Sequence, residues 1–328
     1  MHNILLLTGG GGTEHEISII SAQYIKSQID KERFNIIEVE INKQKDWIWN
    51  GQKSELSFDQ HLKTRKEKIK IDAVIPCLHG FPGETGDIQG MLEVLGIPFL
   101  GCGSQGSIFC FNKLVTKLLL ENAGLKTTPF LNINPAHYKD EAELFLETHG
   151  DIFVKATNQG SSVGCYKITG QNKELLHQRI KEALTLSSYV ILEKAVVGRE
   201  LELSAFEFNN EVHLTKPGEI LTGSEFYDYE DKYSEQSTAK TIVEAENIPR
   251  DVLGQIFEQA KTAFAALQIR HLARIDFFYS VEGEVFINEV NTFPGHTKIS
   301  MFPMMMENYG VKYSDFINQH LYHLVQKH

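Results

Sequence analysis

Four polar side chains near the end of the chain have the types and spacing to bind a metal ion. Two β-prone runs flank a Glu-Gly pair, and with that pair as a two-residue turn Asp276 faces Glu289 and Arg274 faces Asn291. Residues two apart share one face of a strand, so all four lie together. Two facing carboxylates repel each other, and with an amide oxygen they suit a hard cation such as Mg²⁺, which usually shares phosphate ligands. The alternative is a solvated polar face on an edge hairpin.

A glycine-rich loop near the N-terminus predicts a second site. It follows a predicted buried strand over residues 4–8 and precedes a helix that we expect to begin near Ser18, an arrangement that commonly binds anions. It is not a dinucleotide fingerprint, because Glu14 stands where the third glycine is required, and no P-loop motif exists in the chain. A carboxylate at this position repels a pyrophosphate and attracts an amine.

His79 follows the predicted strand over residues 71–78 and precedes a glycine-containing loop. Open α/β sheets bind their ligands at the carboxyl ends of strands, which favours a place for His79 in the site. A structural histidine is the equal alternative.

Lysines in the middle of the chain predict a nucleotide site. Lys113 lies on an amphipathic helix, Lys155 stands near the end of a strand, and the hydroxyl-rich loop 157–164 follows. Backbone N–H groups and hydroxyls of such a loop can close over phosphates, although ordinary hairpin tips are also rich in Gly and Ser. Charged residues over 193–200 cluster with these lysines, which gives a nucleotide-site hypothesis.

The polar, aromatic segment 223–240 is long for a loop in a compact domain, which is typical of a lid. Disorder is the alternative, and the tyrosines and phenylalanine of the segment argue that it packs on something.

Strands and helices must position these residues. In the N-terminal third, predicted strands over residues 36–41, 71–78 and 98–100 alternate with helical segments, which predicts an open parallel α/β sheet. A length of 328 residues allows two or three domains. We therefore expect an α/β (α+β) protein.

Charge and cysteine use narrow the class of protein. The formal charge of −11 argues against nucleic-acid or anionic-membrane partners. Four cysteines without a CxxC pair fit reduced thiols in a cytoplasm. The first residues lack a signal peptide, and no apolar run reaches membrane-spanning length.

Six motifs, in order along residues 3–325, resemble those of bacterial D-alanine–D-alanine ligases, a family of the ATP-grasp superfamily. They are Gly-Gly-Thr-Glu14-His-Glu-Ile-Ser18, His79-Gly-x-x-Gly-Glu-x-Gly-x-x-Gln-Gly, Gly160-Ser161-Ser162-Val-Gly, Phe-Tyr-Asp-Tyr-Glu-Asp-Lys232-Tyr233, Arg274-Ile-Asp276 and Asn288-Glu289-Val-Asn291-Thr-x-Pro-Gly295. The resemblance implies a three-domain ATP-grasp architecture with ATP between the last two domains. The domains are an N-terminal one that binds the first substrate, a central one, and a C-terminal one with the 223–240 lid and the metal hairpin: 1–103, 104–193 and 194–328.

The resemblance also implies roles for single residues. As Mg²⁺ ligands it implies Asp276, Glu289 and Asn291. As ATP contacts it implies Lys113, Lys155, Glu193, Lys194, Val196, Glu200 and Lys232. It implies that Glu14, supported by Ser161 and Tyr233, holds the ammonium group of the first substrate, and that His79 lines the same pocket. It implies that Arg274 and the Gly295 N–H donate hydrogen bonds to the oxyanion of the reaction. It also implies that Ser300 and Met301 bind the carboxylate of the second substrate.

The activity that the resemblance implies is ATP-dependent ligation of two D-alanines for peptidoglycan synthesis, by a cytoplasmic homodimer that uses two Mg²⁺ ions, with Mn²⁺ able to substitute. The alternatives are another ATP-grasp ligase, one with D-serine or D-lactate as second substrate, or a non-catalytic nucleotide-binding protein. Tyr233 favours an amine substrate, because ester-forming relatives often lose this tyrosine. The departures from the family pattern are Ser107–Asn112, His296 and Met301.

Overall fold

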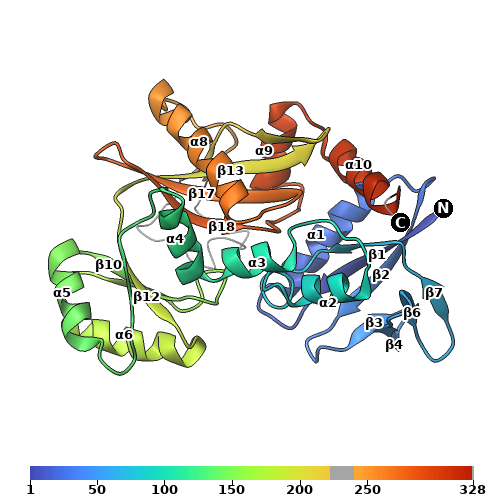
Figure 1. The fold of residues 1–328 in the computed structure, drawn as a ribbon, viewed down its shortest axis with the longest axis horizontal. Helices are drawn as coiled ribbons and strands as arrows, with labels where there is room; N and C mark the ends of the chain where they lie inside the picture. The colour runs from blue at the N-terminus through green and yellow to red at the C-terminus, as the bar shows by residue number, and fades with distance from the viewer. Residues whose placement is uncertain (222–239, 327–328) are drawn as a thin grey trace.

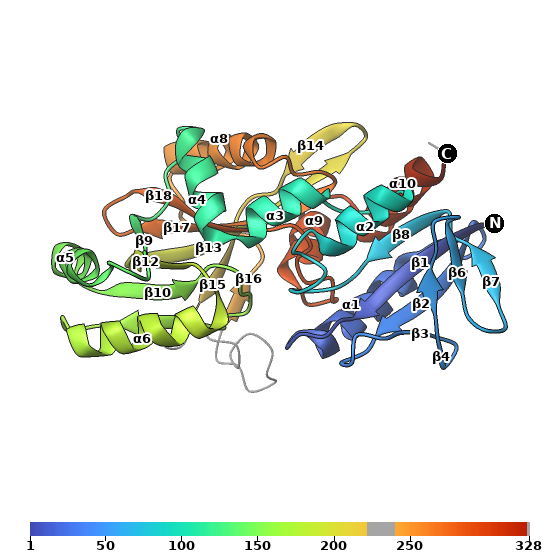
Figure 2. The same cartoon turned by 60° about the horizontal axis from the view of Figure 1, so that its bottom comes forward.

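The computed structural model describes residues 1–221 and 240–326. Figures 1 and 2 show sheets at three places along an elongated molecule, with helices on their faces. Searched over the described residues alone, the helices include none with the length and apolar character to cross a membrane.

The N-terminal part is an open α/β sheet, as predicted. Its strand order is β4-β3-β2-β1-β8, and β1 runs parallel to both β2 and β8, while β3 and β4 add an antiparallel edge. The strands are β1 (His2–Gly9), β2 (Phe34–Ile41), β3 (Trp47–Trp49), β4 (Gln52–Lys53) and β8 (Ala73–Pro76), and a small separate sheet holds β5 (Glu55–Leu56), β6 (His61–Lys63) and β7 (Lys68–Lys70). The predicted strand over 98–100 is wrong, because only a single bridge joins Phe99 to Val74.

Helices cover this sheet and lead to the next one. They are α1 (His15–Gln28), α2 (Asp87–Leu95), α3 (Ser104–Phe111) and α4 (Lys113–Asn122). Helix α1 begins three residues before the predicted Ser18, directly after Glu14. Helix α4 is capped by Asn112, whose side chain accepts from the N–H groups of Leu114 and Val115.

The second sheet is antiparallel, in the order β11-β10-β12-β9. Its elements are β9 (Phe130–Asn132), α5 (Lys139–His149), β10 (Ile152–Ala156), β11 (Cys165–Ile168), α6 (Lys173–Leu186) and β12 (Val190–Lys194). As Figure 2 shows, α5 and α6 lie at one end of the molecule, away from the N-terminal sheet. Both helices pack on strands of this sheet, which leaves its other face toward the third sheet.

The third sheet has the order β16-β15-β13-β17-β18, with β14 paired to β13. Its elements, with the helices beside it, are β13 (Gly198–Phe208), β14 (Glu211–Leu214), β15 (Gly218–Leu221), β16 (Lys240–Ile242), α8 (Arg250–Ala266), β17 (Leu272–Ser280), β18 (Val285–Asn291), α9 (Met301–Tyr309) and α10 (Tyr313–Gln326).

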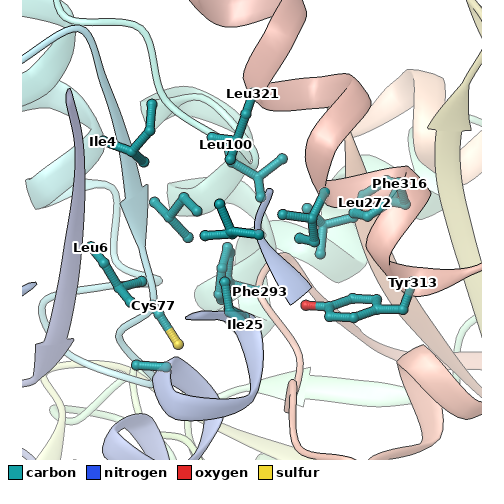
Figure 3. Packing of buried hydrophobic residues seen from close by; sticks show 14 of the residues in the cluster. Ile4, Leu6, Ile25, Cys77, Leu100, Leu272, Phe293, Tyr313, Phe316 and Leu321 are labelled. Atoms are coloured by element: carbon teal, nitrogen blue, oxygen red, sulfur yellow. The ribbon is translucent and has the colours of Figure 1, made fainter. Parts of the chain in front are cut away.

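One hydrophobic core joins the two ends of the chain. Helix α10 packs against α1 and β8, so that Tyr313 and Phe316 are buried in one cluster with Ile4 and Ile25. Figure 3 shows that Phe293 from the loop after β18 belongs to the same cluster. The N-terminal sheet and the loop that follows the hairpin are therefore held together by shared apolar burial.

Candidate active site

The hairpin of β17 and β18 brings the four polar side chains together. Arg274 pairs with Asn291 and Asp276 with Glu289, which confirms the predicted facing pairs. Arg274 donates to both carboxylate oxygens of Asp276, at 2.8 and 2.7 Å, and Asn291 Nδ2 donates to Asp276 at 3.0 Å. In this arrangement Arg274 supplies the positive charge that two facing carboxylates require.

The turn of the hairpin differs from the predicted two-residue loop. The Ser280 N–H donates to the Glu284 carbonyl at 2.8 Å, so the loop holds three residues, with Gly283 at φ +86°. The strand pairs next to the turn are therefore displaced by one residue from the prediction. A β-bulge between Asp276 and Phe277 restores the predicted pairing beyond it.

Glu202 on β13 also faces this hairpin and was missed by the sequence reasoning. It is buried, pairs in register with Asp276, and its Oε1 lies 3.4 Å from Arg274 Nε. Burial opposes the charge on Arg274, but Asp276 and Glu202 outweigh it and raise the Arg274 pKa well above its ordinary value. The available signal was a carboxylate inside an apolar strand, because such a group needs a charged partner.

The hairpin fits a hard cation by its donor chemistry. Asp276, Glu289 and Asn291 offer two carboxylates and an amide oxygen on one face. Among residues 1–221 and 240–326, no group of three or more His, Cys, Asp or Glu side chains is arranged to hold a metal. A cation here would therefore need further oxygens, such as those of a bound phosphate.

A cavity of about 570 Å³ lies beside the hairpin. Its lining includes many of the residues that the sequence singles out: Glu14, His79, Ser161, Arg274, Asn291, Gly295, Ser300 and Met301. These residues come from the N-terminal loop, the loop after β8, the glycine loop after β10, the hairpin of β17 and β18, and the segment after β18. The fold thus gathers the predicted substrate residues around one space.

Glu14 lies in this cavity with a defined partner. Ser161 Oγ donates to Glu14 Oε1 at 2.6 Å, across 147 residues of sequence. Ser161 and Ser162 of the glycine loop both have positive φ values. A carboxylate held in this way is suited to bind an ammonium group.

Glu84 is a second carboxylate of the cavity, and the sequence reasoning gave it no role. It accepts from the Gly80 N–H at 2.8 Å and from the Phe293 N–H at 3.4 Å. Burial raises the pKa of Glu84 to about 8, and the charge of Glu14 adds to the shift. Its position between glycines of a strand-end loop was the signal that could have found it.

The lysines predicted to bind phosphates lie on the second sheet and on α4. Lys155 Nζ donates to Glu193 at 2.8 Å, and Lys113 Nζ donates to the Gln159 carbonyl at 2.6 Å. Burial opposes the charge on Lys155, but Glu193 and, less strongly, Glu289 raise its pKa. The effect of Glu289 links the lysines of the second sheet to the carboxylate hairpin of the third.

Lys117 is a further buried cation that the sequence reasoning missed. Its Nζ donates to Thr127 Oγ1 at 2.6 Å and to Thr128 Oγ1 at 2.7 Å, and lies 3.5 Å from Glu193 Oε1. Burial lowers the pKa of Lys117 to about 8, although Glu193 opposes the shift. Burial also opposes ionisation of Glu193, yet Lys117 and Lys155 lower its pKa to about 2.

The remaining predicted ATP residues lie near the junction of β12 and β13. Lys194 ends β12 and is exposed, Val196 follows it, and Glu200 lies on β13. Lys232, Tyr233 and all but the last residue of the predicted 223–240 lid lie outside the described residues.

The antiparallel sheet with buried lysines, the neighbouring sheet with a carboxylate hairpin, and the cavity beside them define an enzyme of the ATP-grasp class. Two family models match the chain: "D-ala D-ala ligase N-terminus" over residues 3–102 and "D-ala D-ala ligase C-terminus" over residues 119–322.

Individual relatives agree with the family models. The D-alanine–D-alanine ligase of Vibrio vulnificus strain YJ016 is 46% identical, with 97% of each chain covered. A crystal structure of D-alanyl-alanine synthetase A from Vibrio cholerae has a TM-score of 0.93 at 44% identity and covers 99% of this chain and 98% of its own. The VanG D-Ala:D-Ser ligase of Enterococcus faecalis has a TM-score of 0.87 at 29% identity and 99% coverage of both chains. The chain belongs to the D-alanine–D-alanine ligase family.

Proposed function

We propose that the chain joins two D-alanines into D-alanyl-D-alanine, with conversion of ATP to ADP and phosphate, for peptidoglycan precursor synthesis. The observation that carries this proposal is the single cavity in which an ammonium-binding carboxylate, Glu14, and a guanidinium, Arg274, lie beside the carboxylate hairpin.

The first step activates a carboxylate. The first D-alanine binds with its ammonium at Glu14, which Ser161 orients, while His79 lines the pocket. Its carboxylate oxygen attacks the γ-phosphorus of ATP, the bond to ADP breaks, and an acyl phosphate forms. Lys113 and Lys155 neutralise the charge on the phosphates. Asp276, Glu289 and Asn291 would hold Mg²⁺, two ions with Mn²⁺ able to substitute, which supplies further neutralisation when bound.

The second step forms the amide bond. The neutral amine of the second D-alanine, whose carboxylate lies at Ser300 and Met301, attacks the acyl carbon. Arg274 and the Gly295 N–H stabilise the oxyanion of the tetrahedral intermediate, and the amine loses a proton as phosphate leaves. Preorganised donors of this kind act most strongly where water is excluded, because the local dielectric is low.

Further parts of the proposal rest on the family resemblance. The segment 223–240 acts as a lid that excludes water, with Lys232 reaching the phosphates and Tyr233 joining Ser161 and Glu14. Adenosine contacts come from Glu193, Lys194, Val196 and Glu200. The domains are 1–103, 104–193 and 194–328, and the enzyme is a cytoplasmic homodimer.

The structure leads to a pH prediction for nucleotide binding, because Glu193 has two cationic partners. Above about pH 8 Lys117 loses its proton, so Glu193 retains only Lys155 and holds it away from a phosphate. The affinity for ADP with Mg²⁺ should therefore fall as the pH rises from about 7 to about 9.5. Lys117→Met should bind ADP about three- to tenfold more weakly at pH 7 and show little further change with pH. Titration calorimetry in the absence of D-alanine measures both effects.

The matched control for this prediction is Lys181→Met, which removes an exposed lysine on α6 and should keep the pH dependence of the unaltered chain. A Lys117→Met variant that retains the full pH dependence would contradict the role given to Lys117.

Phosphate release with ATP and a panel of D- and L-amino acids and D-lactate, followed by product mass, tests the proposed function. D-Alanine should give the fastest release and a dipeptide product. D-Serine is the second candidate as nucleophile, because the D-Ala:D-Ser ligase has the same fold at 29% identity. Release that no tested acid stimulates would favour the non-catalytic nucleotide-binding alternative.

A further inference from the structure

Ser21 is fully buried on α1 and has no part in the reaction described above. Its Oγ lies 3.0 Å from His79 Nε2 and accepts from the His296 N–H at 3.3 Å. His79 Nδ1 in turn lies 3.2 Å from the carbonyl oxygen of Phe293. Ser21 and His79 thereby connect α1 and the end of β8 to both ends of the segment Phe293–His296.

The partners define the direction of these hydrogen bonds. A carbonyl oxygen can only accept, so His79 Nδ1 carries the hydrogen and donates to Phe293. Burial lowers the pKa of His79, although Glu14 opposes the shift, and a neutral ring leaves Nε2 as an acceptor. The Ser21 hydroxyl therefore donates to His79, and its oxygen remains available to accept from His296. Every donor in this chain of contacts has one acceptor.

A second contact holds the same segment. Glu84 accepts from the Phe293 N–H and from the Gly80 N–H, so it also joins the loop after β8 to the loop after β18. Between the held residues stands Gly295, where an added Cβ would lie 2.8 Å from Ser300 Oγ. Side chains from α1 and from the loop after β8 thus accept hydrogen bonds from the backbone on both sides of Gly295.

We propose that Ser21, acting through His79, is a positioning residue that aligns the Gly295 N–H for the second step of the reaction. This inference rests on the proposed function, in which that N–H stabilises the tetrahedral oxyanion. A donor in an oxyanion hole is effective only at hydrogen-bonding distance from the developing charge, and small displacements lower the rate steeply. Ser21 lies outside the cavity lining and acts on the segment from behind.

The test compares two buried serines on α1. Ser18 is equally buried, but its Oγ accepts from the Gly9 N–H at 2.7 Å and donates to the Cys77 carbonyl at 2.5 Å, and both of these partners belong to the N-terminal sheet region. Ser18→Ala and Ser21→Ala therefore remove one hydroxyl each, and of the two only Ser21→Ala removes a hydrogen bond to the Phe293–His296 segment.

For Ser21→Ala we expect the kcat for dipeptide formation to fall about ten- to a hundredfold, with ADP affinity within about twofold of the unaltered chain. The ratio of phosphate released to dipeptide formed should rise above one, because the acyl phosphate then waits longer and is lost to water. Ser18→Ala should keep kcat within about threefold and the ratio near one. This should hold even if its melting temperature falls as much as that of Ser21→Ala.

Equal kcat losses in the two serine variants, an unchanged kcat in Ser21→Ala, or a parallel loss of ADP affinity would overturn the positioning role. Should Ser21→Ala fail to fold, Ser21→Cys replaces it, and a folded cysteine variant with full kcat would overturn the proposal as well. An unaltered chain that forms no dipeptide would overturn the proposed function and the positioning role together. An active unaltered chain with an unaffected Ser21→Ala overturns the positioning role alone.

Discussion

Glu289→Gln should lower kcat by roughly a thousandfold or more while the fold stays intact, since a bound cation contributes several kcal/mol of charge stabilisation. Glutamine keeps the shape of the side chain but removes one of the two facing carboxylates on β17 and β18. Without Mg²⁺ the melting temperature should change little, because the relieved repulsion with Asp276 is offset by the lost attraction of Glu289 to Lys155 and Arg274. Addition of Mg²⁺ and ADP should raise the melting temperature of the unaltered chain more than that of the variant. Dipeptide formation and thermal unfolding measure these effects.

Glu284→Gln is the matched control, since it makes the same chemical change on the same hairpin. Glu284 forms an ion pair with Lys126 at 3.1 Å, and both side chains are about half exposed. Exposed pairs of this kind contribute about 0–1 kcal/mol, so activity and stability should change little. Ordinary activity of Glu289→Gln at ordinary Mg²⁺ concentrations would show that the hairpin is not the metal site.

Arg274→Lys should lower kcat by about a hundred- to a thousandfold, which is the usual cost of losing one oxyanion donor. The planar guanidinium of Arg274 binds both oxygens of Asp276, and its Nε also lies near Glu202. Lysine keeps the positive charge but loses this forked geometry. The KM for ATP should change much less than kcat, because the lost contact forms chiefly in the transition state. Steady-state kinetics with ATP and D-alanine varied separately give the two constants.

The neighbouring strand offers a control with the same chemistry. Arg199 donates to Glu219 through Nε at 2.7 Å and through a terminal nitrogen at 2.6 Å, and Arg199 does not line the cavity. Arg199→Lys should therefore lose a similar forked pair without a comparable loss of kcat. If the two lysine variants lose the same activity, the effect of Arg274 is general destabilisation and its role as oxyanion donor is wrong.

The proposed mechanism gives Arg274 two tasks at different stages of the reaction. It neutralises Asp276 and lies near Glu202 in the described structure, and it is proposed to face the oxyanion in the second step. A cation held by Asp276 would take over its neutralisation and leave the guanidinium to Glu202 and the reacting oxygen. In this proposal Glu202 remains as the counter-ion of the buried arginine when Asp276 binds the metal.

Several features of the site follow from the sequence because they depend on local periodicity. The alternation of side chains along two strands places Arg274 and Asp276 on the face of Glu289 and Asn291, and the pairing beyond the bulge agrees. Glu14 could be assigned in the same way, because a strand, a glycine loop and a helix follow one another within a few residues. The six motifs, in order along the chain, identified the family, and the comparisons confirm this identification.

Other features were decided only by the tertiary structure. The three-residue turn and its compensating bulge became clear only from the observed strand pairing, in which Gly283 has a positive φ. Ser21, Glu84, Lys117 and Glu202 read as ordinary polar residues until the fold supplies their partners: His296, Phe293, Glu193 and Arg274. Sequence alone determines which side chains share a face, because the backbone period is local. The packing of separate sheets decides which distant group contacts each of these side chains and how polar their surroundings are. These two factors set the charge and pKa of the buried groups in the site.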